Sequence, residues 1–355
     1  MGTRKWFILA SAALLLLLPC ATLVYQASGS SACARCHQIR PSYELWRASS
    51  HREVECSACH GGLLSADLEL HLGNLRRLLR YLGNQNAAPI RISNTSVARV
   101  IERCRDCHRR QYAAWQSGPH SISYARIFLN EEHNRKRALM DDCLRCHGMH
   151  FEGHIGELVT PLDQRGPWQL KARELAERPV LPCLACHQVH RPGQPLRRPW
   201  VERAIPGARQ EIHRPSLAFY DRRQMTPVGL SLLPLPEMRE RGRRVRLSPD
   251  PRQALCYQCH APLAGFEVGS GDDRTPVGVH EGISCLACHE RHTQNTRASC
   301  AGCHPKMSNC GLDVETMDTT FRDPSSRHNI HFVKCADCHP KGVPPKRREA
   351  ALRAD

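Results

Sequence analysis

One short pattern occurs nine times in this chain of 355 residues: two cysteines separated by two residues, followed directly by a histidine. The pattern takes up eighteen of the 20 cysteines, namely Cys33, Cys36, Cys56, Cys59, Cys104, Cys107, Cys143, Cys146, Cys183, Cys186, Cys256, Cys259, Cys285, Cys288, Cys300, Cys303, Cys335 and Cys338. The histidines that complete it are His37, His60, His108, His147, His187, His260, His289, His304 and His339. Any fold of this chain has to present the same three side chains nine times.

Cysteines in such numbers can form disulfides, bind zinc or attach haem. Zinc sites use Cys-x-x-Cys pairs, but zinc gives no reason for a histidine directly after every pair. Covalent haem does, because the two thiols add to the two vinyl groups of the porphyrin and the adjacent histidine binds the iron. We therefore predict nine covalently bound haem c groups, with the nine motif histidines as proximal iron ligands.

Composition agrees with an interior that contains cofactor. Only 41% of the residues are hydrophobic and 5% are aromatic, so we expect too few apolar side chains for an ordinary core, with haem filling much of the interior. The net charge of +16 does not indicate a nucleic-acid partner, because each haem carries roughly −1 when ferric and roughly −2 when ferrous. We expect many arginines and lysines to pair with propionates, and a remaining basic patch to dock a redox partner protein.

The histidines outside the motifs are candidates for the second, distal iron ligand. The chain has 21 histidines, so 12 remain after the nine proximal ones, and nine haems need at most nine more. Iron bound by two imidazoles exchanges electrons readily and leaves no open position for a substrate. The distal candidates are His51, His71, His120, His150, His190, His213, His280, His292 and His331, with His133, His154 and His328 as weaker ones. Met149 and Met307 are predicted to be packing residues rather than ligands.

Two local patterns support these candidates. A Tyr-x-x-Trp-x-x-x-x-His unit follows both the first and the third motif and ends at His51 and at His120. In addition, His51, His280 and His331 each precede a motif by a few residues. The repetition indicates haem-binding units that are used several times.

A third pattern places His150, His190 and His292 three residues after a proximal histidine. Residues three apart on a helix project from the same side, so they cannot bind opposite faces of one haem. Such a histidine is therefore expected to bind the iron of a neighbouring haem and to hold the two haems in contact. The alternative role is a hydrogen bond to a propionate.

The N-terminal segment combines two positive charges with an uncharged run from Trp6 to Tyr25. Such a run is long enough to span a bilayer as an anchoring helix, and a cleaved signal peptide competes with that interpretation. Both place the rest of the chain on the periplasmic side of a bacterial inner membrane. Cys20 is then an apolar residue of this segment, and Cys310 is expected to be unpaired or buried, with a catalytic thiol as the weaker alternative.

The predicted fold is mostly α-helical with extensive loops, a multihaem cytochrome c scaffold organised around stacked haems with little or no β-sheet. Leucines at helical spacing predict one helix over residues 63–83, with its apolar face on haem or on the membrane surface. The predicted organisation is an anchor or signal peptide (1–27), a five-haem region (28–190), a linker or wrapping segment rich in proline and arginine (191–252), a four-haem region (253–340) and a charged tail (341–355).

Residues 1–61 resemble the membrane-anchored NapC/NirT-type quinol dehydrogenases. The resemblance rests on the anchor, on 33–37, on Trp46, on Ser50 with His51, and on 54–60. It implies that the first haem lies close to the membrane and that quinol is a candidate electron donor. Those proteins usually carry fewer haems than this chain has motifs.

Residues 100–339 look like the multihaem cytochromes related to hydroxylamine oxidoreductase and pentahaem nitrite reductase. The motif at 104–108 with Tyr112, Trp115, Ser117 and His120 carries the resemblance, together with the segment Val279–His289. It implies closely stacked haem pairs in a mostly helical scaffold. The chain contains no Cys-x-x-Cys-Lys motif, which argues against the ammonia-forming reduction of nitrite.

The leading functional hypothesis is therefore an electron carrier between the membrane and a periplasmic or outer-surface acceptor. The alternative is a reductase or other oxidoreductase of a small nitrogen or sulfur compound, which would need one five-coordinate haem with polar groups above its open face. A structural, filament-forming cytochrome is a third hypothesis, and the predicted anchor opposes it.

Overall fold

The computed structural model describes residues 39–61, 94–190, 217–261 and 274–296, with a few isolated positions that include 31–35, 331 and 334. Six of the nine motifs fall completely within these residues. Several predicted features lie outside the described residues. They are Cys36 and His37 of the first motif, the motif at 300–304, the cysteines and the histidine of the motif at 335–339, most of the predicted anchor, most of the helix at 63–83, His71, His213 and His328. Met307 and Cys310 also lie outside them.

The described chain is mostly helical with long loops, which confirms the predicted fold class. Its α-helices are α2 (Ser31–Ala34), α3 (Arg40–Arg47), α4 (Cys56–His60), α6 (Asn94–Cys107), α7 (Arg109–Ser117), α8 (Tyr124–Phe128), α9 (Glu131–Lys136), α10 (Ile155–Leu158), α12 (Gln253–Tyr257) and α14 (Cys285–Cys288). Short 3₁₀ turns are η1 (Pro119–Ser121), η2 (Asp141–Arg145), η3 (Arg173–Leu175), η4 (Cys183–Ala185), η5 (Leu230–Leu232) and η6 (Gly278–His280).

The strands form small antiparallel pairs only. They are β1 (Val159–Thr160) with β2 (Gln169–Leu170), β3 (Ala218–Asp221) with β4 (Thr226–Gly229), and β5 (Arg239–Glu240) with β6 (Arg243–Arg244). In the longest pair Ala218 faces Gly229 and Asp221 faces Thr226. No described helix has both the length and the apolar character needed to cross a membrane.

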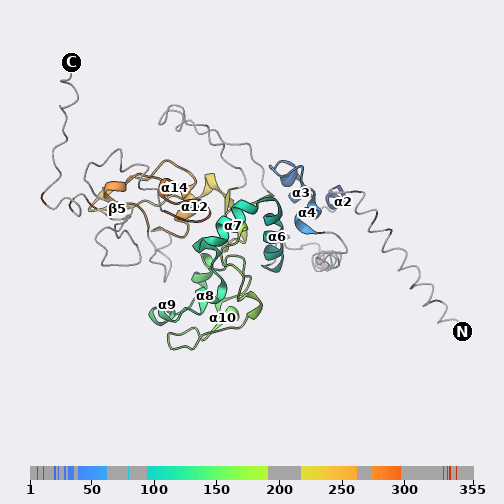
Figure 1. The fold of residues 1–355 in the computed structure, drawn as a ribbon, viewed down its shortest axis with the longest axis horizontal. Helices are drawn as coiled ribbons and strands as arrows, with labels where there is room; N and C mark the ends of the chain where they lie inside the picture. Colours follow the sequence, from blue (N-terminus) through green and yellow to red (C-terminus); the bar gives the residue numbers. More distant parts are fainter. Residues whose placement is uncertain are drawn as a thin grey trace, which may run out of the picture.

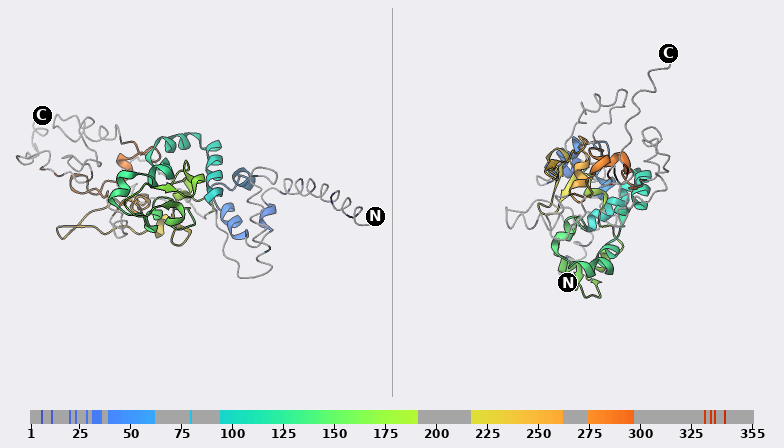
Figure 2. Two further views of the ribbon diagram at one scale, coloured as in Figure 1. Left: turned by 90° about the horizontal axis from the view of Figure 1, so that it is seen from below. Right: turned by 90° about the vertical axis from the view of Figure 1, so that its left-hand side faces the viewer.

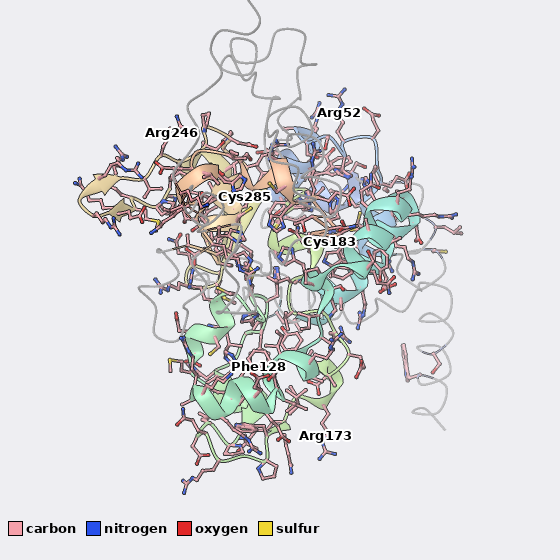
Figure 3. All side chains as sticks on the ribbon, turned by 60° about the vertical axis from the view of Figure 1, so that its left-hand side comes forward. Arg52, Phe128, Arg173, Cys183, Arg246 and Cys285 are labelled. Atoms are coloured by element: carbon pink, nitrogen blue, oxygen red, sulfur yellow. The ribbon has the colours of Figure 1, made fainter. Side chains whose placement is uncertain are left out.

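The elements are arranged as a line of helices with a lobe at its side. Figure 1 shows α4, α6, α7, α12 and α14 following one another across the molecule, while α8, α9 and α10 lie together below this line of helices. The two further views keep the lobe distinct from α3 and α4 (Figure 2). Cys183 and Cys285 lie in the part of the molecule that contains the line of helices, whereas Phe128 and Arg173 lie in the lobe (Figure 3).

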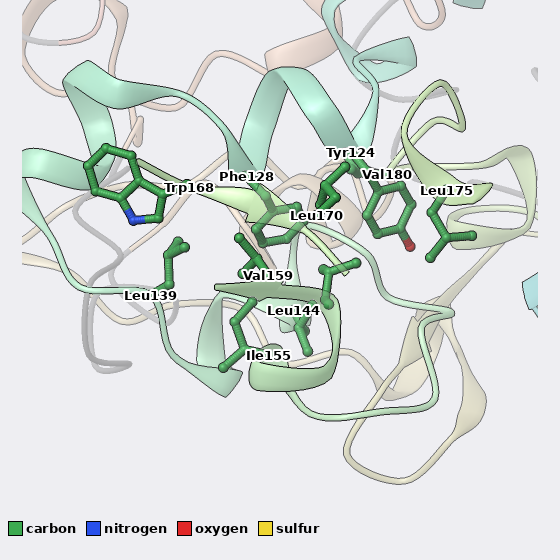
Figure 4. Packing of buried hydrophobic residues seen from close by; sticks show 11 residues of the cluster. Tyr124, Phe128, Leu139, Leu144, Ile155, Val159, Trp168, Leu170, Leu175 and Val180 are labelled. Atoms are coloured by element: carbon green, nitrogen blue, oxygen red, sulfur yellow. The ribbon is translucent and has the colours of Figure 1, made fainter. Parts of the chain in front are cut away.

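The lobe, residues 119–182, has a hydrophobic core built from side chains. Its buried members are Tyr124, Phe128, Leu139, Leu144, Ile155, Leu158, Val159, Trp168, Leu170, Leu175 and Val180 (Figure 4). The sequence-based expectation of an interior too poor in apolar residues is therefore wrong for this part of the chain. Average composition did not reveal this core, because it counts apolar residues without saying which of them the fold brings together.

Two smaller clusters hold the fifth motif in place. On one side Phe219 and Tyr220 of β3 pack with Met149 and Ala185. On the other side Leu184 packs against the buried face of α6. Backbone pairing between His187 and Leu217 adds to this, so η4 and its cysteines are held between α6 and the β3–β4 hairpin.

A buried ion pair joins the sixth and seventh motifs. Arg252, just before α12, binds the Asp250 carboxylate with Nη2 to Oδ2 at 2.8 Å, and the hydroxyl of Ser284 donates to the same oxygen at 3.0 Å. Ser284 also caps α14, since its side chain accepts from the backbone N–H of Leu286. Burial by itself raises the pKa of Asp250, but the hydrogen bonds from Arg252 and Ser284 outweigh it and hold the pKa below the ordinary value.

We predict that Leu158→Ala lowers the stability of the lobe by about 2–5 kcal/mol, because Leu158 is completely buried. Amide hydrogen exchange across residues 119–182 measures this. Leu162→Ala is the matched control, since that side chain is 38% exposed, and it should have little effect. Equal effects of the two substitutions would show that the lobe has no packed core.

We further predict that Asp250→Asn lowers stability by about 1–3 kcal/mol, because it removes the carboxylate from the partly buried Arg252. A depressed pKa contributes stability that is complete above the unfolded value and is lost as the pH falls through the folded value. The difference between the native chain and the variant should thus persist from neutral pH down to about pH 4 and shrink below it. Glu237→Gln removes a partner from the exposed Arg239 and should cost little at any pH. A pH-independent loss in Asp250→Asn would contradict the role of its charge.

Candidate haem-binding site

Each described motif forms a single helical turn. In the five motifs from Cys104 to Cys285 the N–H of the motif histidine donates to the carbonyl of the first cysteine at 2.8–2.9 Å, and the second motif lies within α4. One turn brings residues three and four apart to the same side. The two thiols and the imidazole of each motif can therefore face one porphyrin.

Five of these motif histidines each face another histidine ring from a distant segment. The ring centres are 6.1 Å apart for His108 and His51, 6.0 Å for His60 and His190 and 6.2 Å for His260 and His120. They are 6.2 Å apart for His187 and His292 and 6.3 Å for His289 and His331. Each pair joins one proximal histidine with one histidine predicted as a distal ligand.

This spacing fits a metal ion between the two rings. Imidazole binds first-row metals at about 2 Å, so two nitrogens on opposite sides lie about 4 Å apart, and half a ring on either side brings the ring centres to about 6 Å. Direct stacking would bring them closer, as in the ring pair of His150 and Tyr220 at 3.9 Å. The five pairs therefore have the separation that haem iron requires.

The protonation of the facing rings also suits metal binding. Burial, followed by the nearby His260, lowers the pKa of His120 to about 4. Burial, followed by His108, likewise lowers the pKa of His51. An imidazole must be neutral to offer a lone pair to a metal, and these rings are neutral at pH 7.

His190 shows in addition which nitrogen is available. Its Nδ1 lies 2.8 Å from the carbonyl oxygen of Ser42, so Nδ1 is the donor and carries the proton. Nε2 is then the nitrogen with a free lone pair. A second hydrogen bond of this kind is the usual way in which proteins orient an imidazole ligand.

The motif thiols lie in buried surroundings. Burial is the main cause that raises the pKa of Cys104, to about 12, and it also raises the pKa of Cys143. A thioether sulfur is uncharged and is compatible with such burial, so the donor set agrees with covalent haem.

The repeated Tyr-Trp-His unit has the same local structure both times. The rings of Tyr43 and Trp46 are 5.3 Å apart, and those of Tyr112 and Trp115 are 5.5 Å apart. Each tryptophan donates its Nε1–H to a backbone carbonyl, that of Val54 in the first unit and that of Leu181 in the second. The two histidines that end the units, His51 and His120, both face a motif histidine.

The other candidates lie in different surroundings. His150 is buried and stacks on Tyr220, and His280 ends η6. His133 lies in α9 of the lobe, and the exposed His154 makes an ion pair with Asp141 at 2.7 Å. Met149 packs in the cluster around β3, as predicted for a packing residue.

Sequence reasoning missed the groups that hold the ligand segments together. Arg145 of the fourth motif donates to the carbonyl of Gln258 in the sixth motif at 2.6 Å. Glu281, next to His280, accepts two hydrogen bonds from Arg243 at 2.7 Å each. The signal for Arg145 was weak, because the two variable positions inside a Cys-x-x-Cys motif carry no fixed role.

Gly118 is a further missed residue, and its importance comes from close packing. A Cβ on Gly118 would lie 2.7 Å from the carbonyl oxygen of Thr293 and 2.8 Å from that of His292. Its backbone is extended, so any residue could adopt the conformation, but none with a side chain fits. The segment that leads to His120 therefore packs directly on the backbone of His292.

We predict that Gly118→Ala displaces these two ligand segments and costs about 1–3 kcal/mol, since overpacking forces the backbones apart. The holoprotein should gain a high-spin haem signal. Gly156→Ala is the matched control, because its added methyl group would meet only Leu162 Cδ1 at 3.7 Å. An unchanged spectrum for Gly118→Ala would show that the packing does not position the ligands.

Comparisons with known proteins agree with this geometry. Residues 103–188 match the family described as cytochrome c554 and c-prime, and residues 245–305 match cytochrome c7 and related cytochrome c. The cytochrome c-type protein NrfH of Wolinella succinogenes is 24% identical over 154 residues, which are 42% of this chain and 82% of that protein. No solved structure matches the chain. The motifs, the facing imidazoles and these matches together identify the chain as a multihaem c-type cytochrome.

Proposed function

We propose that the protein is an electron carrier with nine haem c groups, one on each Cys-x-x-Cys-His motif, and that every iron is bound by two histidines. The facing imidazoles carry this proposal. Two protein ligands on opposite sides of a metal fit haem, because the porphyrin occupies the four remaining positions. Each pair also uses one motif histidine and one histidine from elsewhere, as a proximal and a distal ligand must.

The five described pairs support five proposed distal ligands. His51 binds the haem of His108, His190 that of His60, His120 that of His260, His292 that of His187, and His331 that of His289. Four haems and four distal candidates remain, namely His71, His150, His213 and His280. We propose that these complete the haems of the first, fourth, eighth and ninth motifs.

The proposed ligation of each iron by two imidazoles favours electron transfer as the function. Covalently held haem supplies reversible one-electron chemistry, and the histidines keep the iron six-coordinate in both oxidation states. The residues of the chain orient the haems, exclude water from their faces and tune their potentials through burial and charge. This arrangement moves electrons without converting a substrate.

We infer a path that begins at the inner membrane and leads to a periplasmic or outer-surface acceptor. The uncharged run from Trp6 to Tyr25, retained as an anchor or removed after export, supports this location. The resemblance of residues 1–61 to quinol dehydrogenases and the similarity to a cytochrome c-type protein support quinol, or a quinol-oxidising protein, as the donor. The proposed partners are redox proteins, and we propose no nucleic-acid partner.

Mass spectrometry of the mature holoprotein should show nine haem adducts, and the oxidised protein should show only low-spin ferric haem in its paramagnetic resonance spectrum. The double variant Cys104→Ser, Cys107→Ser should lose one adduct. Cys310→Ser, a cysteine outside the motifs, should lose none. A stoichiometric high-spin signal that shifts with nitrite, hydroxylamine or sulfite would instead favour an enzyme, and substantially fewer than nine adducts would contradict the haem count.

A further inference from the structure

Two short segments of the chain each carry histidines that face two different motifs. In the first, His187 completes the fifth motif, while His190, three residues later, faces His60 of the second motif at 6.0 Å between ring centres. In the second, His289 completes the seventh motif, while His292 faces His187 of the fifth motif at 6.2 Å. Each segment therefore connects two haem sites that are far apart in the sequence.

We propose that the haems of the second, fifth and seventh motifs form one continuous row, in which each motif supplies the distal ligand of the preceding haem. This inference rests on the proposed two-histidine ligation and adds the order of the haems in space. Three residues of chain span at most about 10 Å, so a pair of ligands three residues apart holds its two haems as direct neighbours. The order along the row is thus not the order of the motifs in the chain.

The row continues at both ends. At its N-terminal end His51 faces His108 of the third motif at 6.1 Å, and the same short stretch of chain leads from His51 to His60 in α4. Helix α4 of the second motif contacts α6, which carries both cysteines of the third motif, so the second and third motifs lie close together. At its C-terminal end His331, shortly before the ninth motif, faces His289 at 6.3 Å.

A side branch connects the row with the lobe. The backbone of His292 lies against Gly118, two residues before His120, and His120 faces His260 of the sixth motif at 6.2 Å. The sixth motif in turn receives the hydrogen bond from Arg145 of the fourth motif. The sixth-motif haem therefore lies beside the row, with the fourth motif and the lobe beyond it.

The row joins the part of the protein nearest the proposed membrane segment to the C-terminal motifs. In the proposed row, electrons that enter at the second or third motif reach the seventh motif through the fifth-motif haem. The fourth motif and the packed lobe are bypassed. The fifth-motif haem, held between α6 and the β3–β4 hairpin, is then the connection between the two halves of the chain.

Ligand variants test this arrangement, because two ligands of one iron have non-additive effects and ligands of two irons have additive ones. We expect His292→Ala to convert one haem to high spin without loss of a haem adduct. The double variant His187→Ala, His292→Ala should show no more high-spin haem than His187→Ala alone, since both residues bind the fifth-motif iron. This holds even if His187→Ala prevents attachment of that haem, because His292 then has no haem to bind. A further high-spin equivalent in the double variant would overturn the row.

His289 and His292 lie in one segment but bind two different irons in the proposed row, so their effects should be additive. His289→Ala with His292→Ala is expected to perturb two haems, one in the seventh motif and one in the fifth, although the residues are only three apart. A single perturbed haem would contradict the proposal that this segment binds two irons. Peptide mapping by mass spectrometry identifies the motif that loses its haem wherever attachment fails.

His133→Ala provides the control, because His133 lies in α9 of the lobe and faces no motif histidine among the residues with described positions. It should leave the spin state of every haem unchanged. Failure of the row can be told from failure of the proposed function. Additive His187 and His292 effects in an otherwise low-spin protein with nine haems reject the order alone, whereas high-spin haem in the native protein rejects the ligation itself.

Discussion

The structure is organised around pairs of facing imidazoles, which the proposed function places on opposite sides of one iron. The motif provides one of them locally, within a single helical turn, but the second has to come from elsewhere in the chain. In each described pair the second histidine lies in or near a different motif, with ring centres 6.0–6.3 Å apart. Each pair brings distant segments together, and under the proposed ligation it would act as a cross-link through iron. Haem attachment and folding of the row should therefore be strongly coupled.

Side-chain packing and hydrogen bonds within the polypeptide also stabilise the fold. The lobe has a packed core that includes Phe128 and Leu158, and this core does not need a cofactor to bury its apolar surface. Between the motifs, the polar ties from Arg145 to Gln258 and from Ser284 to Asp250 hold ligand segments at fixed positions. Buried polar groups of this kind are strongly directional, so they specify one arrangement where apolar contacts alone would allow several. These polar contacts can thus position the motif segments where the helices are short.

Much of the candidate site can be predicted from the sequence, because haem attachment depends on a local sequence motif. The nine motifs, the proximal histidines and the helical fold class follow from it. The i+3 argument also predicts that His190 and His292 cannot serve their own motif, and the structure places each beside the histidine of another motif. The identity of that other motif cannot be predicted, since it depends on contacts between segments far apart in the sequence. Gly118 shows the same limit: its backbone is ordinary, and only the packed neighbour reveals why a side chain is excluded there. The core of the lobe was missed because composition counts apolar residues but does not show which of them pack together in the fold.

The most direct test of the paired imidazoles is an anomalous-scattering map of the crystallised holoprotein at the iron absorption edge. The account predicts an iron peak midway between the two rings of each described pair, between His60 and His190 as well as between His187 and His292. Peaks that lie beside the motif histidines but have no second imidazole opposite would contradict it.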